Sequence, residues 1–138
     1  MLAAAVLWMG ALSGYDIARR RLPNWLTLPG AGAILVSAGV AGRGVPALMG
    51  AAALAAVYLV VHLATPTAMG AGDVKLALGL GALTGCFGVD VWLLAALGAP
   101  LLTVVLGVIA WASRMGPTVP HGPSMCVASA AAAGLAVW

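Results

Sequence analysis

Charged residues are scarce in this 138-residue chain, and their scarcity excludes an ordinary water-soluble domain. Only 7% of the residues are charged, as six basic and three acidic side chains, whereas 64% are hydrophobic. A soluble domain carries about a quarter charged residues. So few charges cannot cover a water-facing surface, and the surroundings of the chain are therefore expected to be mainly lipid.

Two other features are missing, and each excludes a class of function. The basic residues are scattered and form no contiguous face with stacking aromatics, so we expect no nucleic-acid binding. The two cysteines, Cys86 and Cys126, lie far apart and form no Cys-x-x-Cys pair. They provide neither a zinc ligand set nor a disulfide framework, and we expect no metal and no cofactor.

Charge, proline and glycine divide the chain into six apolar stretches. Long apolar runs without alternation favour helices, because only helices and closed barrels satisfy their backbone in lipid. Several are shorter than the roughly 20 residues of a full span, so they must borrow flanking residues or face a thinned, wet region of the bilayer. We predict an all-α integral membrane protein, a bundle of about six transmembrane helices in one domain, residues 1–138. The stretches are approximately Leu2–Tyr15, Leu26–Ala41, Ala47–Ala64, Val74–Phe87, Val91–Ala112 and Ser124–Trp138.

The basic residues set the expected orientation. With six spans, the first, third and fifth loops lie on one side of the membrane, and the second and fourth loops lie on the other. Five basic residues fall in the odd loops (Arg19, Arg20, Arg21, Lys75 and Arg114), and only Arg43 falls in an even loop. By the positive-inside rule, the odd loops are cytoplasmic and both termini are outside. Asp16 and Asp73 then lie at the cytoplasmic face, and Asp90 lies at the other face.

The three aspartates are the only acidic residues. An ionisable side chain within or beside a span costs several kcal/mol unless it is paired or hydrated, so each is a functional candidate. Asp90 directly precedes an expected span, where the ordinary role is a helix N-cap. Asp16 and Asp73 differ because they end at one depth on one side of the bundle.

The surroundings of Asp73 predict that it points into the bundle. Gly70 and Gly72 precede it and allow a backbone geometry or a close approach that larger residues block. Steps of four residues from Asp73 give the small residues Ala77, Gly81 and Gly85. Small residues at this spacing mark the side of a membrane helix that packs closely on a neighbour.

Two carboxyl groups in one site suggest aspartic protease chemistry. Like charges a few ångströms apart cannot both ionise cheaply, so the pair retains one proton. The ionised member can take a proton from a water that attacks a peptide carbonyl, and the protonated member can donate to the carbonyl oxygen and then to the leaving amine. The alternative is that each aspartate separately anchors a helix end. The residues alone leave both interpretations open.

Three segments resemble signatures of one family, the prepilin peptidases. The segment from Asp16 through Arg21, Leu22, Pro23 and Asn24 to Leu-Thr-Leu-Pro resembles the first-aspartate signature. Gly70-Ala-Gly-Asp-Val-Lys-Leu76 is similar to the family's Gly-x-Gly-Asp-x-Lys-Leu signature, which includes Gly72, Asp73 and Lys75. Val119-Pro-His-Gly-Pro123, which includes Pro120 and Gly122, resembles its Pro-Phe-Gly-Pro segment ahead of the last helix, with His121 in place of Phe.

The resemblance implies that Asp16 and Asp73 are the catalytic aspartates of a GxGD intramembrane aspartic protease. It also implies cleavage of short, positively charged leaders from prepilin-like or pseudopilin-like precursors at the cytoplasmic face of the inner membrane. Larger members of the family carry an insertion with paired cysteines that is linked to N-methylation. This sequence has no such pairs, so we expect a compact peptidase without methyltransferase activity.

Other residues have more modest interpretations. Pro23 and Asn24 predict a turn into the second span, with Asn24 as N-cap. We expect Lys75 to serve topology or contact headgroups, His62 to be a hydrogen-bonded structural residue, and His121 to lie in a loop. Two rival functions remain. A proton-coupled transporter also uses intramembrane carboxyl groups, although nearer the middle of the membrane, and a non-catalytic membrane assembly subunit would use its small-residue faces only for packing. The residues do not predict an oligomeric state.

Overall fold

The computed structural model describes residues 1–116 and 118–138, and the described chain is all-helical, as predicted. The predicted loop 113–123 contains residue 117, which lies outside the described residues. The helices are α1 (Leu2–Arg19), α2 (Asn24–Val40), α3 (Gly44–Ala64), α4 (Ala71–Gly85), α5 (Val89–Ala112) and α6 (His121–Val137). Each corresponds in order to one predicted apolar stretch.

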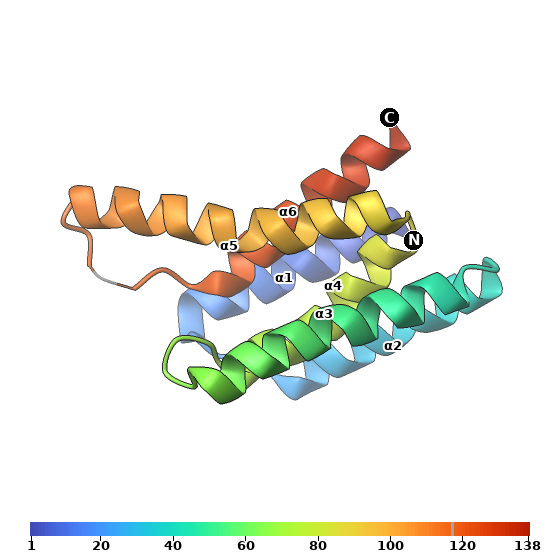
Figure 1. Cartoon of the computed structure of the whole chain (residues 1–138), viewed down its shortest axis with the longest axis horizontal. Coiled ribbons are helices and arrows are strands. Elements are labelled where there is room, and N and C mark those ends of the chain that lie inside the picture. Colours follow the sequence, from blue (N-terminus) through green and yellow to red (C-terminus); the bar gives the residue numbers. More distant parts are fainter. Residues whose placement is uncertain (117) are drawn as a thin grey trace.

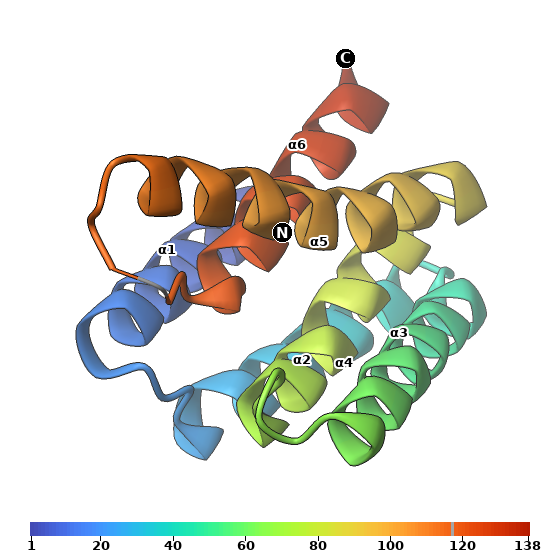
Figure 2. The ribbon, with the colours of Figure 1, turned by 60° about the vertical axis from the view of Figure 1, so that its left-hand side comes forward.

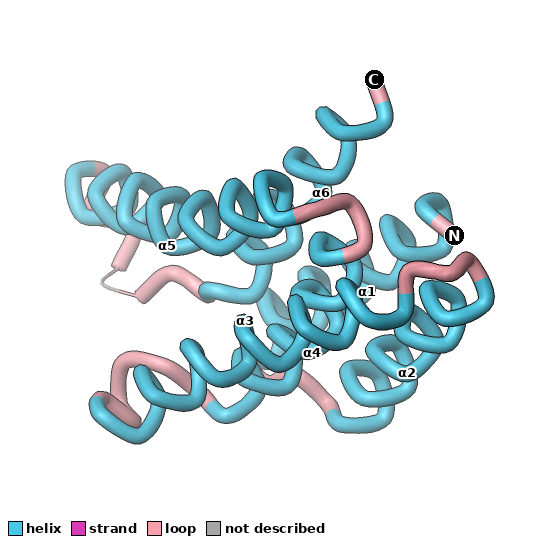
Figure 3. The backbone as a smooth tube through the Cα atoms, turned by 45° about the vertical axis from the view of Figure 1, so that its right-hand side comes forward, coloured by secondary structure: helices cyan, strands magenta, loops and turns pink. Residues whose placement is uncertain are grey.

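The helices run up and down, so alternate connections meet at the same end (Figure 1). The α1–α2, α3–α4 and α5–α6 connections lie at the left-hand end of Figure 1, whereas both termini lie toward the right. Figure 3 shows the α3–α4 and α5–α6 loops at one end of the bundle. The loops that carry most of the basic residues are therefore gathered at one end of the bundle.

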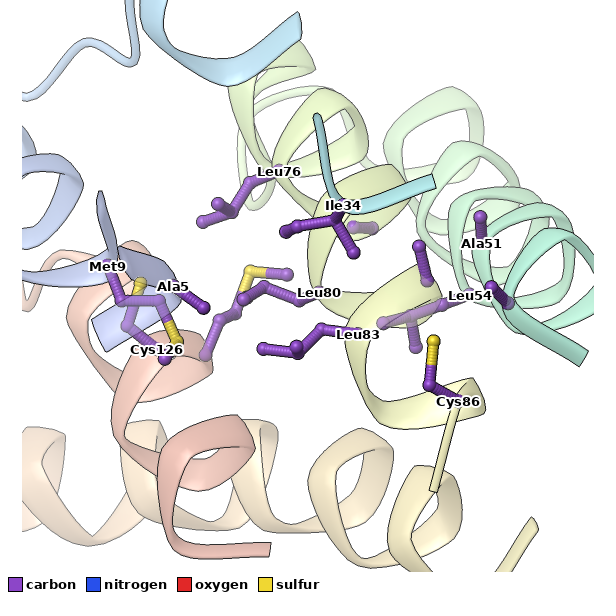
Figure 4. Close-up of a cluster of buried hydrophobic side chains, with 14 of the residues drawn as sticks. Ala5, Met9, Ile34, Ala51, Leu54, Leu76, Leu80, Leu83, Cys86 and Cys126 are labelled. Atoms are coloured by element: carbon purple, nitrogen blue, oxygen red, sulfur yellow. The ribbon is translucent and has the colours of Figure 1, made fainter. Parts of the chain in front are cut away.

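The helix α4 is the centre of the bundle, although it is the shortest helix. It packs chiefly on α3 and α2 and also contacts α5 and α6 (Figure 2). Leu76, Leu80 and Leu83 on α4 are fully buried, and Figure 4 shows them between side chains of α1, α2, α3 and α6. Almost every residue of α4 from Leu76 onward is buried, so this helix is enclosed by protein on nearly all sides.

The predicted small-residue face of α4 packs closely on α3. A methyl group added at Gly81 would lie 2.9 Å from Cβ of Leu54, and one added at Gly85 would lie 2.6 Å from the carbonyl oxygen of Pro46. The prediction that this face packs tightly on a neighbouring helix is confirmed. Because glycine carries only a hydrogen at these positions, the backbones of α3 and α4 can lie in direct contact.

Two of the described helices are long and apolar enough to cross a membrane, namely α3 with 21 residues and α5 with 24. The helix α2 is apolar but has only 17 residues. On α5, the apolar side chains Leu97, Leu101 and Val104 are each more than 60% exposed. Such a surface suits lipid rather than water. By length and composition, the described helices thus give two candidate spans and not the predicted six.

Several predicted helix boundaries were wrong, and the differences matter for the site. The helix α1 continues beyond its predicted end to Arg19, so Asp16 lies inside the helix. The helix ends there because Arg20 adopts a left-handed conformation with φ 49°. Asn24 is the first residue of α2, and its N-cap is Pro23. Asp90 lies within the first turn of α5, whose N-cap is Gly88. His121 is the first residue of α6 rather than a loop residue.

Candidate active site

A cavity of about 430 Å³ opens at the end of the bundle where the basic loops gather. Its wall is made by the end of α1, the α1–α2 and α3–α4 connections, the start of α4 and the residues before α6. Both Asp16 and Asp73 line it, together with Arg20, Arg21 and Lys75. Two aspartates that are far apart in the sequence thus share one cavity with basic side chains.

Asp16 is held in place by the start of α6. It lies in the last turn of α1 with only 8% of its surface exposed. Its Oδ2 accepts a hydrogen bond of 3.0 Å from the backbone N–H of Gly122. The first N–H groups of a helix have no partner within the helix, so this bond satisfies a free donor and fixes the orientation of the carboxyl group.

Gly122 is required at this contact for a steric reason. A methyl group at this position would lie 3.0 Å from Cγ of Asp16 and closer still to Oδ2. A residue with a side chain would push the carboxyl group away from the helix start. This explains why Gly122, predicted only as part of a motif, has a direct role in the geometry of the site.

Asp73 also lines the cavity, in the first turn of α4. It is half-buried, and its backbone N–H bonds to the carbonyl oxygen of Gly70 at 3.1 Å. Of the two motif glycines, Gly72 is tightly packed, because a methyl group there would lie 3.1 Å from Cβ of Leu22. At Gly70 the nearest atom would be 3.9 Å away, so close approach explains the second glycine of the motif but not the first.

Lys75 and Asn24 join two elements of the cavity wall. The Nζ of Lys75 donates a hydrogen bond of 2.6 Å to Oδ1 of Asn24, which ties the first turn of α4 to the start of α2. Asn24 therefore uses its side chain to bind Lys75, and α2 has no side-chain cap. The predicted headgroup role of Lys75 is not tested, but its ammonium has a partner within the protein.

The histidines have partners of different kinds. Nδ1 of His62 lies 2.7 Å from the carbonyl oxygen of Met69, so the prediction of a hydrogen-bonded structural histidine is confirmed. His121 lines the cavity, with Nδ1 2.6 Å from Oγ1 of Thr103 and Nε2 3.0 Å from the hydroxyl of Tyr58. Sequence reasoning missed this cluster. Its only signal was that Tyr58 and Thr103 are two of the few polar residues in α3 and α5.

Arg20, which follows α1, connects the end of this helix to the loop before α6. Its Nη1 donates a hydrogen bond to Oγ1 of Thr118. Asp16 and Arg20 are one helical turn apart, and the backbone N–H of Arg20 bonds to the carbonyl oxygen of Asp16 at 2.8 Å. The end of α1 is thus attached to the start of α6 at Asp16 and to the loop before α6 at Arg20. Within the described residues, no three His, Cys, Asp or Glu side chains gather as a metal site.

Comparison with known proteins agrees with the resemblance in the sequence. The model of the type IV leader peptidase family matches residues 3–116, which include both Asp16 and Asp73 but not α6. No curated protein and no solved structure matches the chain significantly. Together with the two long apolar helices, the family match indicates a membrane protein. The chain belongs to the type IV leader peptidase family and is a peptidase of that kind.

Proposed function

We propose that this protein is an intramembrane aspartic endopeptidase that removes the leader from prepilin-like precursors. The observation that carries the proposal is the cavity shared by Asp16 and Asp73, which come from different helices. An isolated structural role for each aspartate does not require them to share a cavity. Membership of the family supplies the substrate class.

The chemistry follows from two carboxyl groups in one cavity. The pair holds a single proton, because two like charges at close range are costly. The ionised aspartate takes a proton from a water as that water attacks the scissile carbonyl, and the other aspartate donates its proton to the carbonyl oxygen. As the C–N bond breaks, the aspartate that took the water proton gives it to the leaving amine, and the other aspartate regains its proton from a hydroxyl of the tetrahedral intermediate, which becomes the new carboxyl group. The Gly122 N–H on Oδ2 of Asp16 keeps this carboxyl group oriented throughout.

We propose that all six helices lie in the membrane and that the cavity faces the cytoplasm. The shorter helices are partly covered by their neighbours, α4 by α2, α3, α5 and α6, and α6 by α5 and α1. Together with flanking residues, this cover means that they need not be long apolar spans. Arg20, Arg21 and Lys75 line the cavity, and basic residues favour the cytoplasmic side. A substrate whose apolar helix remains in the bilayer would then present its leader junction at the depth of the aspartates.

The test is cleavage of a precursor with a short basic leader and an apolar helix, using purified protein in liposomes. We expect Asp16→Asn and Asp73→Asn each to lower the cleavage rate by a factor of about 100 to 10,000 or more, which is the usual contribution of a general acid or base. Asp90→Asn is the matched control. Asp90 is exposed in the first turn of α5, outside the cavity, so this variant should cleave at the wild-type rate.

Full activity in Asp16→Asn or in Asp73→Asn would contradict the paired mechanism. The same liposomes also test the rival functions. Proton flux that depends on Asp16 or Asp73, without cleavage of any precursor, would favour a transporter. Normal insertion with neither flux nor cleavage would favour an assembly subunit.

A further inference from the structure

The two aspartates belong to different groups of helices. The helix α4 packs chiefly on α3 and α2, whereas α6 packs chiefly on α5 and α1. Asp73 therefore belongs to the α2–α3–α4 group, and Asp16 belongs to the α1–α5–α6 group. In Figure 2, α5 and α6 lie in the upper part and α1 at the left, whereas α2, α3 and α4 lie below and toward the right. The distance between the aspartates depends on the contacts that join the groups near the cavity.

His121 makes such a contact. It begins α6, and its ring bonds to Thr103 on α5 and to Tyr58 on α3. The rings of Tyr58 and His121 also lie together, with centroids 5.7 Å apart. Tyr58 is buried and His121 is half-buried, so water competes little for these bonds. The cluster thus joins α6 and α5 to the other helix group.

One tautomer of His121 satisfies all the bonds of the cluster at once. When the hydroxyl of Thr103 donates to the carbonyl oxygen of Ala99, 3.0 Å away, it accepts from His121. In that arrangement Nδ1 carries the hydrogen. Nε2 of the neutral ring is then an acceptor, and the Tyr58 hydroxyl donates to it. Donors and acceptors match along the whole chain from Tyr58 to Ala99.

The position of this cluster next to Gly122 connects it to the site. His121 immediately precedes Gly122, whose N–H binds Oδ2 of Asp16. Holding the ring of His121 between Tyr58 and Thr103 therefore holds the first turn of α6, and with it the donor to Asp16. A small rotation of that turn would move the N–H away from the carboxyl group.

We propose that His121 is a positioning residue that aligns Asp16 with Asp73, with Tyr58 and Thr103 as its anchors. This inference rests on the proposed function of the two aspartates. It assigns to His121 no contact with the substrate and no proton transfer. Loss of alignment between catalytic groups lowers the rate of the chemical step more than it weakens substrate binding.

The first test is kinetic and compares kcat with KM in the liposome assay. His121→Phe keeps a planar ring and removes both hydrogen bonds, and we expect kcat to fall by about 10- to 100-fold with KM nearly unchanged. Tyr58→Phe should also lower kcat. Because both variants break the same bond, the double variant should lose no more than His121→Phe alone, which is the non-additivity expected of coupled residues. Tyr15→Phe removes the hydroxyl of a tyrosine outside the cluster and should leave kcat unchanged.

Two conservative variants separate the anchors. His121→Gln places a polar group near the position of Nε2 and can keep the Tyr58 bond, whereas His121→Asn places one near Nδ1 and can keep the Thr103 bond. The cluster joins the helix groups through Tyr58, so we expect His121→Gln to recover more of kcat than His121→Asn. Equal activity of both with His121→Phe would contradict the role of Tyr58 as the anchor across the groups.

A second test does not depend on activity. In protein labelled with ¹⁵N-glycine, the Gly122 amide signal can be assigned by its loss in Gly122→Ala, and Asp16→Asn should shift it by weakening the hydrogen bond. We expect His121→Phe to shift the same signal in the same direction. An unchanged Gly122 signal, a wild-type kcat in His121→Phe, or a rise in KM alone would each overturn the positioning role. These outcomes leave the proposed function intact, which fails only if the Asp16 and Asp73 variants keep cleaving.

Discussion

Two pairs of glycines in this protein have the same spacing and opposite surroundings. Gly81 and Gly85 are four residues apart on α4, and Gly10 and Gly14 are four residues apart on α1. A methyl group at Gly81 or Gly85 would strike the backbone of α3, whereas one at Gly10 or Gly14 would meet no atom within 4 Å. The spacing is therefore not sufficient to identify a packed face. A glycine pair forms a packed face only where another helix lies against it, and of these two pairs only the one on α4 has such a neighbour.

The two aspartates of the site are held in place by different kinds of contact. The α3–α4 interface sets the position of α4, and α4 carries Asp73 in its first turn. Glycine contacts of this kind fix the distance between two helix axes, because backbone atoms on both sides cannot move aside. The end of α1 that carries Asp16 is fixed instead by hydrogen bonds to Gly122 and Thr118. One aspartate is thus positioned by close packing, and the other is positioned by polar contacts.

The largest effect is expected at Gly81. In Gly81→Ala, the new methyl group would lie 3.0 Å from Cα of Ala51 and 2.9 Å from Cβ of Leu54, with the carbonyl oxygen of Gly50 closer still. Because these are mostly backbone atoms, α3 and α4 must separate. We expect a loss of about 3 kcal/mol in the free energy of unfolding, at the upper end for an overpacked core. Unfolding in detergent micelles measures it, and a wild-type unfolding midpoint would contradict the packed interface.

A smaller effect is expected where the neighbour is a side chain. A methyl group at Gly79 would lie 2.6 Å from Cη2 of Trp8, and the Trp8 indole is itself held by a bond of 2.7 Å from Nε1 to the carbonyl oxygen of Leu26. The indole can shift, but only by weakening that bond. Gly79→Ala should therefore cost about 1–2 kcal/mol of unfolding free energy.

The variant Trp8→Phe provides the control for the Gly79 prediction. A phenyl ring lacks the outer ring atoms of the indole, so Gly79→Ala should cost less in that background than in the wild type. A coupling energy above about 0.5 kcal/mol between the two changes would identify the steric contact as the cause. Purely additive effects would show that the loss at Gly79 arises elsewhere.

Much of the fold could be predicted from the sequence, because a segment in lipid must be apolar and must satisfy its own backbone hydrogen bonds. Apolar stretches separated by charge, proline and glycine predicted the number and the order of the helices. Their ends were predicted less well, since helix ends depend on local conformations such as the left-handed Arg20. The face of α4 with Gly81 and Gly85 was predicted to pack closely, but a spacing cannot say that the partner is α3.

The site was predictable only in part. Counting charges in alternate loops placed Asp16 and Asp73 at the same end, and they line one cavity. The cluster of Tyr58, Thr103 and His121 was not found, because its members come from three helices and are joined only by tertiary packing. Each looked ordinary in its own segment. A cluster of this kind can be identified only from a structure. Two aspartates in an apolar chain, in contrast, can be identified as candidates from the sequence alone.

The smallest effect, and one of opposite sign, is expected at Gly14. Nothing lies within 4 Å of a methyl group at this position, and Gly14 is exposed in the interior of α1. Alanine loses less backbone freedom than glycine on forming a helix, so Gly14→Ala should stabilise the protein by up to about 0.5–1 kcal/mol. The same unfolding measurement that finds Gly81→Ala destabilised should find Gly14→Ala equal to or above the wild type. A loss at Gly14 comparable to that at Gly81 would mean that α1 has a packing partner outside this chain, and the contrast between the two glycine pairs would then disappear.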